Sequence, residues 1–106
     1  MRKRWGWYLV LLRRKHFKVK LLYFKEGGAI SMQRHKHRDE LWLWIFGTGT
    51  FDNGNFLERL YHRKKKAGGF EKICGGGWHK FTASKPTLVL EIQYGDKCSE
   101  RDIERA

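Results

Sequence analysis

Proline and cysteine are scarce in this chain of 106 residues, which has one proline, Pro86, and two cysteines, Cys74 and Cys98. Neither cysteine belongs to a Cys-x-x-Cys pair, so the sequence gives no support to a cysteine-ligated zinc site. Two cysteines allow one disulfide at most, and in a reducing compartment we expect both to be free thiols. The apolar runs are also short, and none approaches the roughly 20 residues that a membrane-spanning helix needs.

The N-terminal residues 1–4 are basic and precede an apolar stretch, residues 5–12, that lacks the small-residue cleavage site of a signal peptide. We therefore expect a cytoplasmic protein with no membrane segment. Acidic residues are few, because 11 Asp and Glu stand against 23 Lys and Arg, which gives a formal net charge of +12. Such a surplus favours anionic ligands, such as phosphates, nucleotides or nucleic acid, without distinguishing among them.

Apolar and aromatic side chains are plentiful, at 41% and 15% of the residues. That is enough for a core, and the length predicts a single domain over residues 1–106. The apolar residues fall in short runs that glycine-rich or charged stretches separate, which is typical of β-strands. We predict strands at residues 5–12, 17–24, 29–37, 41–46, 70–73, 78–82 and 87–94, and turns at residues 13–16, 27–28, 52–55 and 84–86.

Eight or so short strands with little helix indicate an all-β barrel or sandwich. A jelly roll fits, because it brings strands from distant parts of the chain around one cavity. In the strand predicted at residues 17–24, Lys18 and Lys20 share one face, and Val19 and Leu21 share the other. Residues 99–102 resemble a capping box, which predicts that a short C-terminal helix begins there.

The segment from Gln33 to Glu40 carries the clearest chemical pattern. In an extended strand, Gln33, His35 and His37 point to one side. Two imidazoles at i, i+2 can bind one metal ion, and the Glu40 carboxylate, where the chain turns into the next strand, can supply a third ligand. A distant histidine would close the site, and His79 is the candidate. The alternative is a solvated basic strand, since cations occupy positions 34, 36 and 38.

Four blocks of sequence form a recognisable set. They are Trp5-Gly6; Gly28 to Glu40, which Trp42 and Gly47-Thr48 continue; Gly76 to His79; and Glu91 to Gly95 with Glu100 to Arg105. Together they resemble the cupin domain of type II phosphomannose isomerases, which is also found fused behind mannose-1-phosphate guanylyltransferases. The second block is similar to that family's G-x-x-S-x-Q-x-H-x-H-R-x-E, and the third to the second cupin motif, although Cys74 replaces its proline. Residues 50–73 lie outside the resemblance.

The resemblance implies a cupin-type jelly-roll β-barrel with a short C-terminal helix, and such barrels commonly pair as homodimers. It implies one divalent metal ion (Zn, Mn, Fe, Co or Ni) held by His35, His37, Glu40 and His79, with Gln33 as an alternative ligand. The implied reaction interconverts mannose 6-phosphate and fructose 6-phosphate, which moves a proton between adjacent carbons. Our candidates are Glu91 for that proton transfer and Arg38, Lys80 and Lys20 for binding the phosphate of the substrate.

A second hypothesis is a small binding module that holds a nucleotide or nucleic acid without turnover. Guanylyltransferase activity is not expected, because the resemblance covers only the cupin part of the fusion enzymes. The charge cluster at residues 62–66 favours the binding module, as do the aromatics interleaved with cations at residues 4–7 and 78–81. Metal content, isomerase turnover and salt-dependent binding to polyanions distinguish the two hypotheses.

Overall fold

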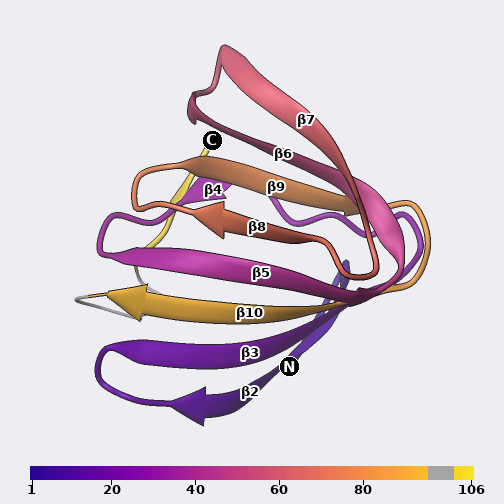
Figure 1. Cartoon of the computed structure of the whole chain (residues 1–106), viewed down its shortest axis with the longest axis horizontal. Helices are drawn as coiled ribbons and strands as arrows, with labels where there is room; N and C mark the ends of the chain where they lie inside the picture. The colour runs from indigo at the N-terminus through magenta and orange to yellow at the C-terminus, as the bar shows by residue number, and fades with distance from the viewer. Residues whose placement is uncertain (96–101) are drawn as a thin grey trace.

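The computed structural model describes residues 1–95 and 102–106, and those ranges contain strands but no helix (Figure 1). The strands are β1 (Arg2–Lys3), β2 (Gly6–Arg13), β3 (Phe17–Phe24), β4 (Gln33–Arg34), β5 (Arg38–Phe46), β6 (Thr48–Phe56), β7 (Arg59–Lys66), β8 (Phe70–Ile73), β9 (Trp78–Ala83), β10 (Thr87–Gly95) and β11 (Glu104–Arg105). The predicted all-β class is confirmed. Within the described ranges, no helix could cross a membrane.

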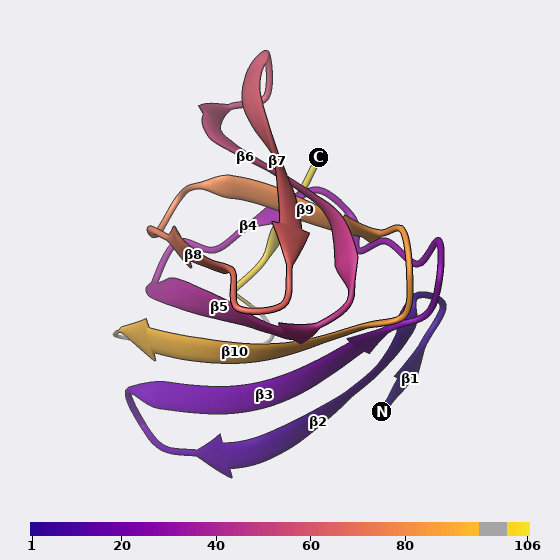
Figure 2. The same ribbon diagram turned by 45° about the vertical axis from the view of Figure 1, so that its right-hand side comes forward.

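The strands form two antiparallel sheets. The larger sheet has the strand order β1-β2-β3-β10-β5-β8, and the smaller sheet has the order β11-β4-β9-β6-β7. Strand β10 pairs with both β3 and β5, so strands from three distant parts of the chain lie side by side. Figure 2 shows the sheets curving toward each other around the interior. This topology lets residues far apart in the sequence reach one cavity.

Aromatic side chains fill part of the space between the sheets. Phe24 of β3, Trp42 and Trp44 of β5, Phe51 of β6 and Phe81 of β9 are each at most 2% exposed. Ring centroids lie 5.0 Å apart for Phe24 and Phe81, and 5.4 Å apart for Trp42 and Phe51. Each buried aromatic removes about 150–250 Å² from water, so these residues dominate the core energetics. The core thereby fixes the relative position of β5 and β9, which carry two of the candidate metal ligands.

The inner face of the larger sheet is polar along part of its length. Lys18 and Lys20 of β3 are buried there, at 1% and 5% exposure. Their cross-strand partners on β10 are Gln93 and Glu91, and Glu40 of β5 lies opposite Gln93. Because side chains alternate along a strand, the apolar residues between these polar ones point outward. This part of the sheet therefore reverses the usual order of apolar inside and polar outside.

Two local predictions are wrong. The strand expected at residues 29–37 is reduced to β4 and a single bridge between Ala29 and Thr82. The turn expected at residues 52–55 lies inside β6 instead, where Asp52 pairs with Lys80 of β9. Pairing with a strand on each side outweighs the local turn preference of Asn and Gly, and the chain turns at residues 57–58.

The predicted C-terminal helix begins at residues 99–101, which lie outside the described residues. The described residues that follow, 102–106, contain the two-residue strand β11 instead of a helix. Cys74 is exposed, just after β8, and forms no disulfide with any residue that the structure describes. Cys98 lies outside the described residues, so the absence of a disulfide stays a prediction.

Candidate metal centre and adjoining cavity

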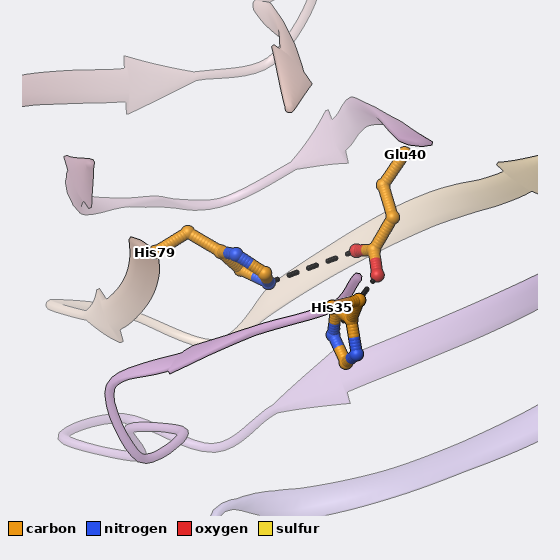
Figure 3. Close-up of side chains that lie close together, drawn as sticks. All are labelled: His35, Glu40 and His79. Carbon is orange, nitrogen blue, oxygen red and sulfur yellow. Dashed lines mark ion pairs between the residues drawn. The ribbon is translucent and has the colours of Figure 1, made fainter. Parts of the chain in front are cut away.

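Three buried side chains from different parts of the chain meet in the interior (Figure 3). Glu40 belongs to β5 and His79 to β9, and His35 directly follows β4. Nε2 of His35 lies 3.1 Å from Oε2 of Glu40, and Nε2 of His79 lies 3.7 Å from Oε1 of the same carboxylate. One potential ligand atom from each residue lies within 4.8 Å of the others. We refer to these three residues as the central group.

Backbone carbonyls hold the second ring nitrogen of each histidine. Nδ1 of His35 contacts the carbonyl oxygen of Asp102, and Nδ1 of His79 lies 3.2 Å from that of Gly77. A carbonyl oxygen can only accept, so Nδ1 donates in both rings and Nε2 keeps its lone pair. Burial lowers the pKa of both histidines, which favours the neutral rings. Two imidazole lone pairs and a carboxylate therefore converge, and such an arrangement attracts a cation.

The Glu40 carboxyl is ionised although it is fully buried. Burial alone would raise its pKa, but the imidazoles of His79 and His35, the Arg38 guanidinium and the Trp42 indole hold the pKa at about 2. Arg38 donates from Nε to Oε2 of Glu40 at 2.9 Å and from a terminal nitrogen to Nε2 of His35 at 3.0 Å. Trp42 donates from Nε1 to Oε1 at 2.9 Å. These donors fix the carboxylate in one orientation, as the hydrogen bonds around a metal-binding carboxylate do.

His37 does not join the central group. Its side chain is exposed, because the chain bends at residues 36 and 37 instead of continuing β4. The Asp102 carboxylate holds this bend, since it accepts hydrogen bonds from the backbone N–H of Lys36 at 3.0 Å and of His37 at 2.7 Å. Slight burial would raise the pKa of Asp102, but these hydrogen bonds lower it. The expectation that His37 shares a face with His35 is therefore wrong.

Gln33 occupies a better position for a fourth ligand. It is the cross-strand partner of His79 in the β4–β9 pair, which places the two side chains on the same face of the smaller sheet. It also lines the same cavity as His35. Its amide oxygen is an acceptor that divalent ions accept as a ligand. The alternative that uses Gln33 is thus the one that agrees with the geometry.

A cavity of about 360 Å³ adjoins the central group. Its buried lining includes His35, Arg38, Lys20 and Glu91, and Tyr8 of β2 contributes its ring. The Lys20 ammonium lies 4.3 Å from the centre of that ring. The exposed part of the lining consists of Lys3, Arg4, Ser31 and Arg105, so all but Ser31 are cationic. The volume falls in the range of small-molecule sites, about 300–1,000 Å³.

Glu91 is the carboxyl among the residues that line this cavity. Burial and then the nearby charge of Glu40 raise its pKa to about 8, although Lys20 acts in the opposite direction. Its Oε1 accepts a hydrogen bond of 2.5 Å from the side-chain amide of Gln93, two residues along the same strand. A carboxyl with a pKa near neutrality can both give and take a proton, which is what a general acid or base requires.

The comparison with known families agrees with this arrangement. A family model described as the mannose-6-phosphate isomerase C-terminal matches residues 1–106. The chain belongs to this family. Mannose-1-phosphate guanylyltransferase from Escherichia coli is 35% identical over 103 residues, which make up 95% of this chain and 21% of the relative. The protein of the same name from Klebsiella pneumoniae is 36% identical over the same shares. This family member therefore spans about a fifth of the length of those curated relatives.

Solved structures show the fold of this family member. A protein from Bacillus halodurans superposes with a TM-score of 0.79 at 20% identity, over 85% of this chain and 70% of that chain. A Klebsiella pneumoniae protein with a double-stranded β-helix domain gives 0.76 at 20% identity, over 92% and 80% of the two chains. At these identities the likeness concerns the fold alone. The predicted jelly-roll barrel of the cupin type is confirmed.

A divalent metal ion fits the donors of the central group. Nε2 of His79 is buried and has no hydrogen-bond partner in the part of the chain that the structure describes. An unsatisfied acceptor at such a depth is costly, and a cation between His79 and Glu40 would satisfy it. Two imidazole nitrogens, a carboxylate oxygen and the nearby amide of Gln33 form a donor set that suits Zn, Mn, Fe, Co or Ni.

The residues predicted to bind phosphate divide between two locations. Arg38 and Lys20 line the cavity, but both are deeply buried. Lys80 lies on the outer face of β9, opposite Asp52, because it directly follows the inward-pointing His79. Lys80 is not among the residues that line the cavity, so the geometry does not place it with Arg38 and Lys20.

Sequence reasoning missed two features of the site. It assigned Asp102 to a helix cap, whereas this residue holds the bend at residues 36–37 and contacts His35. Its partners lie more than 60 positions earlier in the chain, so no local pattern marks the contact. It also passed over the cations at the cavity entrance, Lys3, Arg4 and Arg105, which lie at the two ends of the chain. They meet only in the folded chain, where β1 is an edge strand of the larger sheet and β11 is an edge strand of the smaller sheet.

Proposed function

We propose that this domain is a metal-dependent isomerase of hexose 6-phosphates that interconverts mannose 6-phosphate and fructose 6-phosphate. The observation that carries the proposal is the position of Glu91, a carboxyl with a pKa of about 8, in the cavity that His35 of the central group also lines. Membership in the mannose-6-phosphate isomerase C-terminal family supports the choice of substrate. The cationic entrance suits a ligand that carries one phosphate.

The residues that would hold the metal ion are His35 and His79 through Nε2, Glu40 through its carboxylate and Gln33 through its amide oxygen. When bound, a divalent ion supplies positive charge that stabilises the negative charge developing on the sugar oxygens at C1 and C2. Hydrogen bonds fix the tautomer of both imidazoles and the orientation of the Glu40 carboxylate, so these ligands are already arranged for the ion.

Glu91 is the residue that we assign to proton transfer. In its ionised form it removes the proton from C2 of the aldose, which leaves an enediolate, and it returns that proton to C1 while the hydroxyl proton of O2 passes to O1, so one carboxyl serves both carbon atoms. The side-chain amide of Gln93 donates a hydrogen bond that holds the Glu91 carboxyl in place. The buried Lys20, which is the cross-strand partner of Glu91, favours the ionised form of that carboxyl. The low dielectric of the cavity strengthens each of these interactions.

Phosphate recognition is assigned to the exposed cations of the entrance, Lys3, Arg4 and Arg105. They lie on the solvent side of the same cavity, whereas Arg38 and Lys20 belong to its buried part. A hexose 6-phosphate placed with its reactive C1–C2 end toward the central group extends its phosphate toward the entrance. The assignment predicts that neutralising Arg4 and Arg105 together raises KM more than it lowers kcat.

A coupled assay for fructose 6-phosphate formation tests the proposal, with the protein loaded in turn with each of the five candidate metals. We expect turnover with at least one metal, and Glu91→Gln should lower kcat by about 10²–10⁴-fold at unchanged metal content. Glu71→Gln is the matched control, because Glu71 is equally buried, at 5% exposure, but lies on β8 outside the cavity lining. The absence of turnover with every metal would refute the proposal, as would full activity in Glu91→Gln.

A second candidate function is the binding of nucleic acid on the outer face of the smaller sheet. On that face Thr48 and Thr50 of β6 lie opposite Lys66 and Lys64 of β7. With Ser84, these residues line a groove of about 550 Å³. Lysine and hydroxyl side chains are common contacts of phosphate backbones.

This candidate predicts that a labelled single-stranded oligonucleotide binds with an affinity that falls steeply as salt rises. The double substitution Lys64→Ser, Lys66→Ser should abolish binding, whereas Lys25→Ser, at another exposed lysine, should preserve it. Equal binding by both variants would rule out this groove.

A further inference from the structure

The hairpin of β6 and β7 extends past the end of the smaller sheet. Strand β6 pairs with β9 only from Gly49 to Gly54, whereas its pairing with β7 continues as far as Phe56 and Arg59. In the described part of the chain, residues 55–60 therefore pair with no strand outside the hairpin. Figure 2 shows this end of β6 and β7 projecting from the body of the barrel. We refer to residues 55–61 as the hairpin tip.

Large apolar side chains of the hairpin tip lie in solvent. Phe56 is 65% exposed, Leu57 is 42% exposed and Tyr61 is 67% exposed. Phe56 lies opposite Arg59, and Tyr61 comes two residues after Arg59 on β7, so these three side chains share one face of the hairpin. The Arg63 guanidinium continues that face and lies 5.9 Å from the centre of the Tyr61 ring. The tip is therefore one continuous surface of aromatic and arginine side chains.

The charge of the hairpin is strongly one-sided. Residues 55–66 contain five Lys and Arg against one carboxylate, that of Glu58. Arg59 is exposed, and the Arg63 side chain is 53% exposed although its Nη1 lies 3.3 Å from the Glu71 carboxylate. A surface with this surplus attracts an anionic partner, as does the net charge of +12 of the whole chain.

We propose that the hairpin tip docks onto the surface of an anionic lipid bilayer. Phe56 and Leu57 enter the boundary between headgroups and acyl chains, where exposed apolar side chains gain burial. Arg59 and Arg63 lie on the headgroup side and contact lipid phosphates. Tyrosine and arginine suit this depth, because each has an apolar body and a polar end. The contact involves the tip alone and needs no membrane-spanning segment.

The shape of the tip favours a bilayer over a folded or extended partner. A projecting tip is convex, so a folded protein needs a matching pocket for it, whereas a fluid bilayer opens around the inserted side chains. Leu57 has no aromatic ring on which a base could stack, which disfavours single-stranded nucleic acid at this position. Leu9 and Leu11 of β2 are similarly exposed, at 53% and 52%, but their strand carries a single cation.

The proposed docking site is separate from the candidate metal centre and its cavity. Strands β6 and β7, both of them described throughout, contribute no residue to the lining of the cavity of about 360 Å³. Substitutions at the tip therefore leave that lining unchanged. The proposal does not rest on the isomerase activity, and its test measures binding to lipid.

Sedimentation of the whole chain with lipid vesicles tests the proposal. The wild type should bind vesicles of phosphatidylcholine mixed with phosphatidylglycerol, bind vesicles of phosphatidylcholine alone much more weakly, and lose affinity for the mixed vesicles as salt rises. The double substitution Phe56→Ser, Leu57→Ser should lower the affinity for mixed vesicles on the order of 10–100-fold. Arg59→Ser should lower it about 5-fold. Leu57→Ser alone, in the turn, should act in the same direction and covers the case in which the double variant does not fold.

Two variants with substitutions far from the tip are matched controls. Leu9→Ser with Leu11→Ser removes two apolar side chains of similar exposure from β2, and Arg14→Ser removes an exposed cation from the connection between β2 and β3. Both should bind mixed vesicles like the wild type.

Three results would overturn the proposal. One is a wild type that does not bind mixed vesicles at low salt. Another is a loss of affinity in the Leu9, Leu11 variant as large as in the Phe56, Leu57 variant. The third is a Phe56, Leu57 variant that keeps its affinity for vesicles but no longer binds a single-stranded oligonucleotide, which would assign the tip to nucleic acid.

Discussion

The indole Nε1 of Trp42 donates a hydrogen bond of 2.9 Å to Oε1 of Glu40, two residues earlier on the same strand. Residues two apart on a strand lie on the same face, so β5 presents a core residue and a candidate metal ligand side by side. The same indole packs against Phe51 and Phe81. The aromatic core and the central group are therefore mechanically connected, and the orientation of the carboxylate depends on the packing of the core.

Trp42→Phe tests this connection, because it keeps most of the ring and removes the donor. Loss of a hydrogen bond to a buried carboxylate should lower the free energy of unfolding by about 1–3 kcal/mol. The pKa of Glu40 should rise, so less stability should be lost as the pH falls below the ordinary value of 4.5, and the loss should end at a higher pH than in the wild type. Urea denaturation from neutral to acidic pH measures both effects.

Trp44→Phe is the control for that experiment. Its Nε1 is buried without a hydrogen-bond partner in the described part of the chain, so this substitution removes no hydrogen bond. It should lower the free energy of unfolding less than Trp42→Phe does. It should also leave the pH dependence of stability in acid unchanged. Equal effects from the two variants would show that ring packing, and not the hydrogen bond to Glu40, decides the outcome.

Metal binding should separate the three motif histidines into two classes. His35→Ala and His79→Ala should each reduce the affinity for Zn, Mn or Co by more than the 10–100-fold typical of losing an outer-shell partner. His37→Ala should bind metal like the wild type, because His37 is exposed and lies outside the central group. Titration calorimetry and elemental analysis after dialysis measure the difference. Loss of metal in His37→Ala as large as in His35→Ala would show that the bend rearranges when metal binds.

Much of this site could be predicted from the sequence, because its parts are marked by chemistry. His35, Glu40 and His79 stand out as metal-competent residue types, and the structure brings them together. The failure at His37 has a physical cause. The prediction placed His35 and His37 on one face because it assumed that the strand continued through both residues. In the structure, the Asp102 carboxylate holds a bend of the chain at that point. A contact between positions 37 and 102 leaves no trace in the local pattern of either segment.

The sequence also could not show which face of the larger sheet points into the interior. The alternation of lysine and apolar residues in β3 is visible in the sequence, but alternation does not say which face is inside. The answer depends on β10, which brings Glu91 and Gln93 opposite the lysines and so supplies polar partners in the interior. Lys18 and Lys20 are buried for that reason. The apolar residues that alternate with them, Val19 and Leu21, therefore point outward.

Asp102→Ala should loosen the bend and the ligand beside it. The substitution removes a carboxylate that accepts two backbone hydrogen bonds, which should cost about 1.5–3 kcal/mol of stability. Metal affinity should also fall, by about 10-fold, because the Asp102 carbonyl holds the tautomer of His35 and its position shifts with the bend. Glu104→Gln, which removes only an exposed ion pair with Arg34, is the control and should change neither quantity appreciably. Wild-type metal affinity in Asp102→Ala would show that the bend does not position His35.

The stability of the metal-free protein should depend on pH through Glu91. Its pKa is about 8 in the folded state against the ordinary value of 4.5, so the folded protein keeps a proton that the unfolded chain has lost between those values. The stabilisation from this group is therefore complete below about pH 4.5 and is lost as the pH rises toward 8. His35 and His79, whose pKa values burial lowers, act in the opposite direction as the pH falls through their ordinary range.

Comparison with Glu91→Gln isolates the effect of Glu91, because glutamine resembles the protonated carboxyl and the two histidines are unchanged. The free energy of unfolding of the variant, relative to the wild type, should rise steadily between about pH 5 and pH 8 and level off above that. A divalent ion at the central group adds positive charge near Glu91 and lowers its pKa, so with metal this rise should be smaller and should level off at a lower pH. Guanidinium unfolding of both proteins at several pH values, with and without Zn, measures the curves. Parallel curves across the whole range would mean that Glu91 is already ionised at neutral pH, and the proton-transfer role would then rest on the ionised form alone.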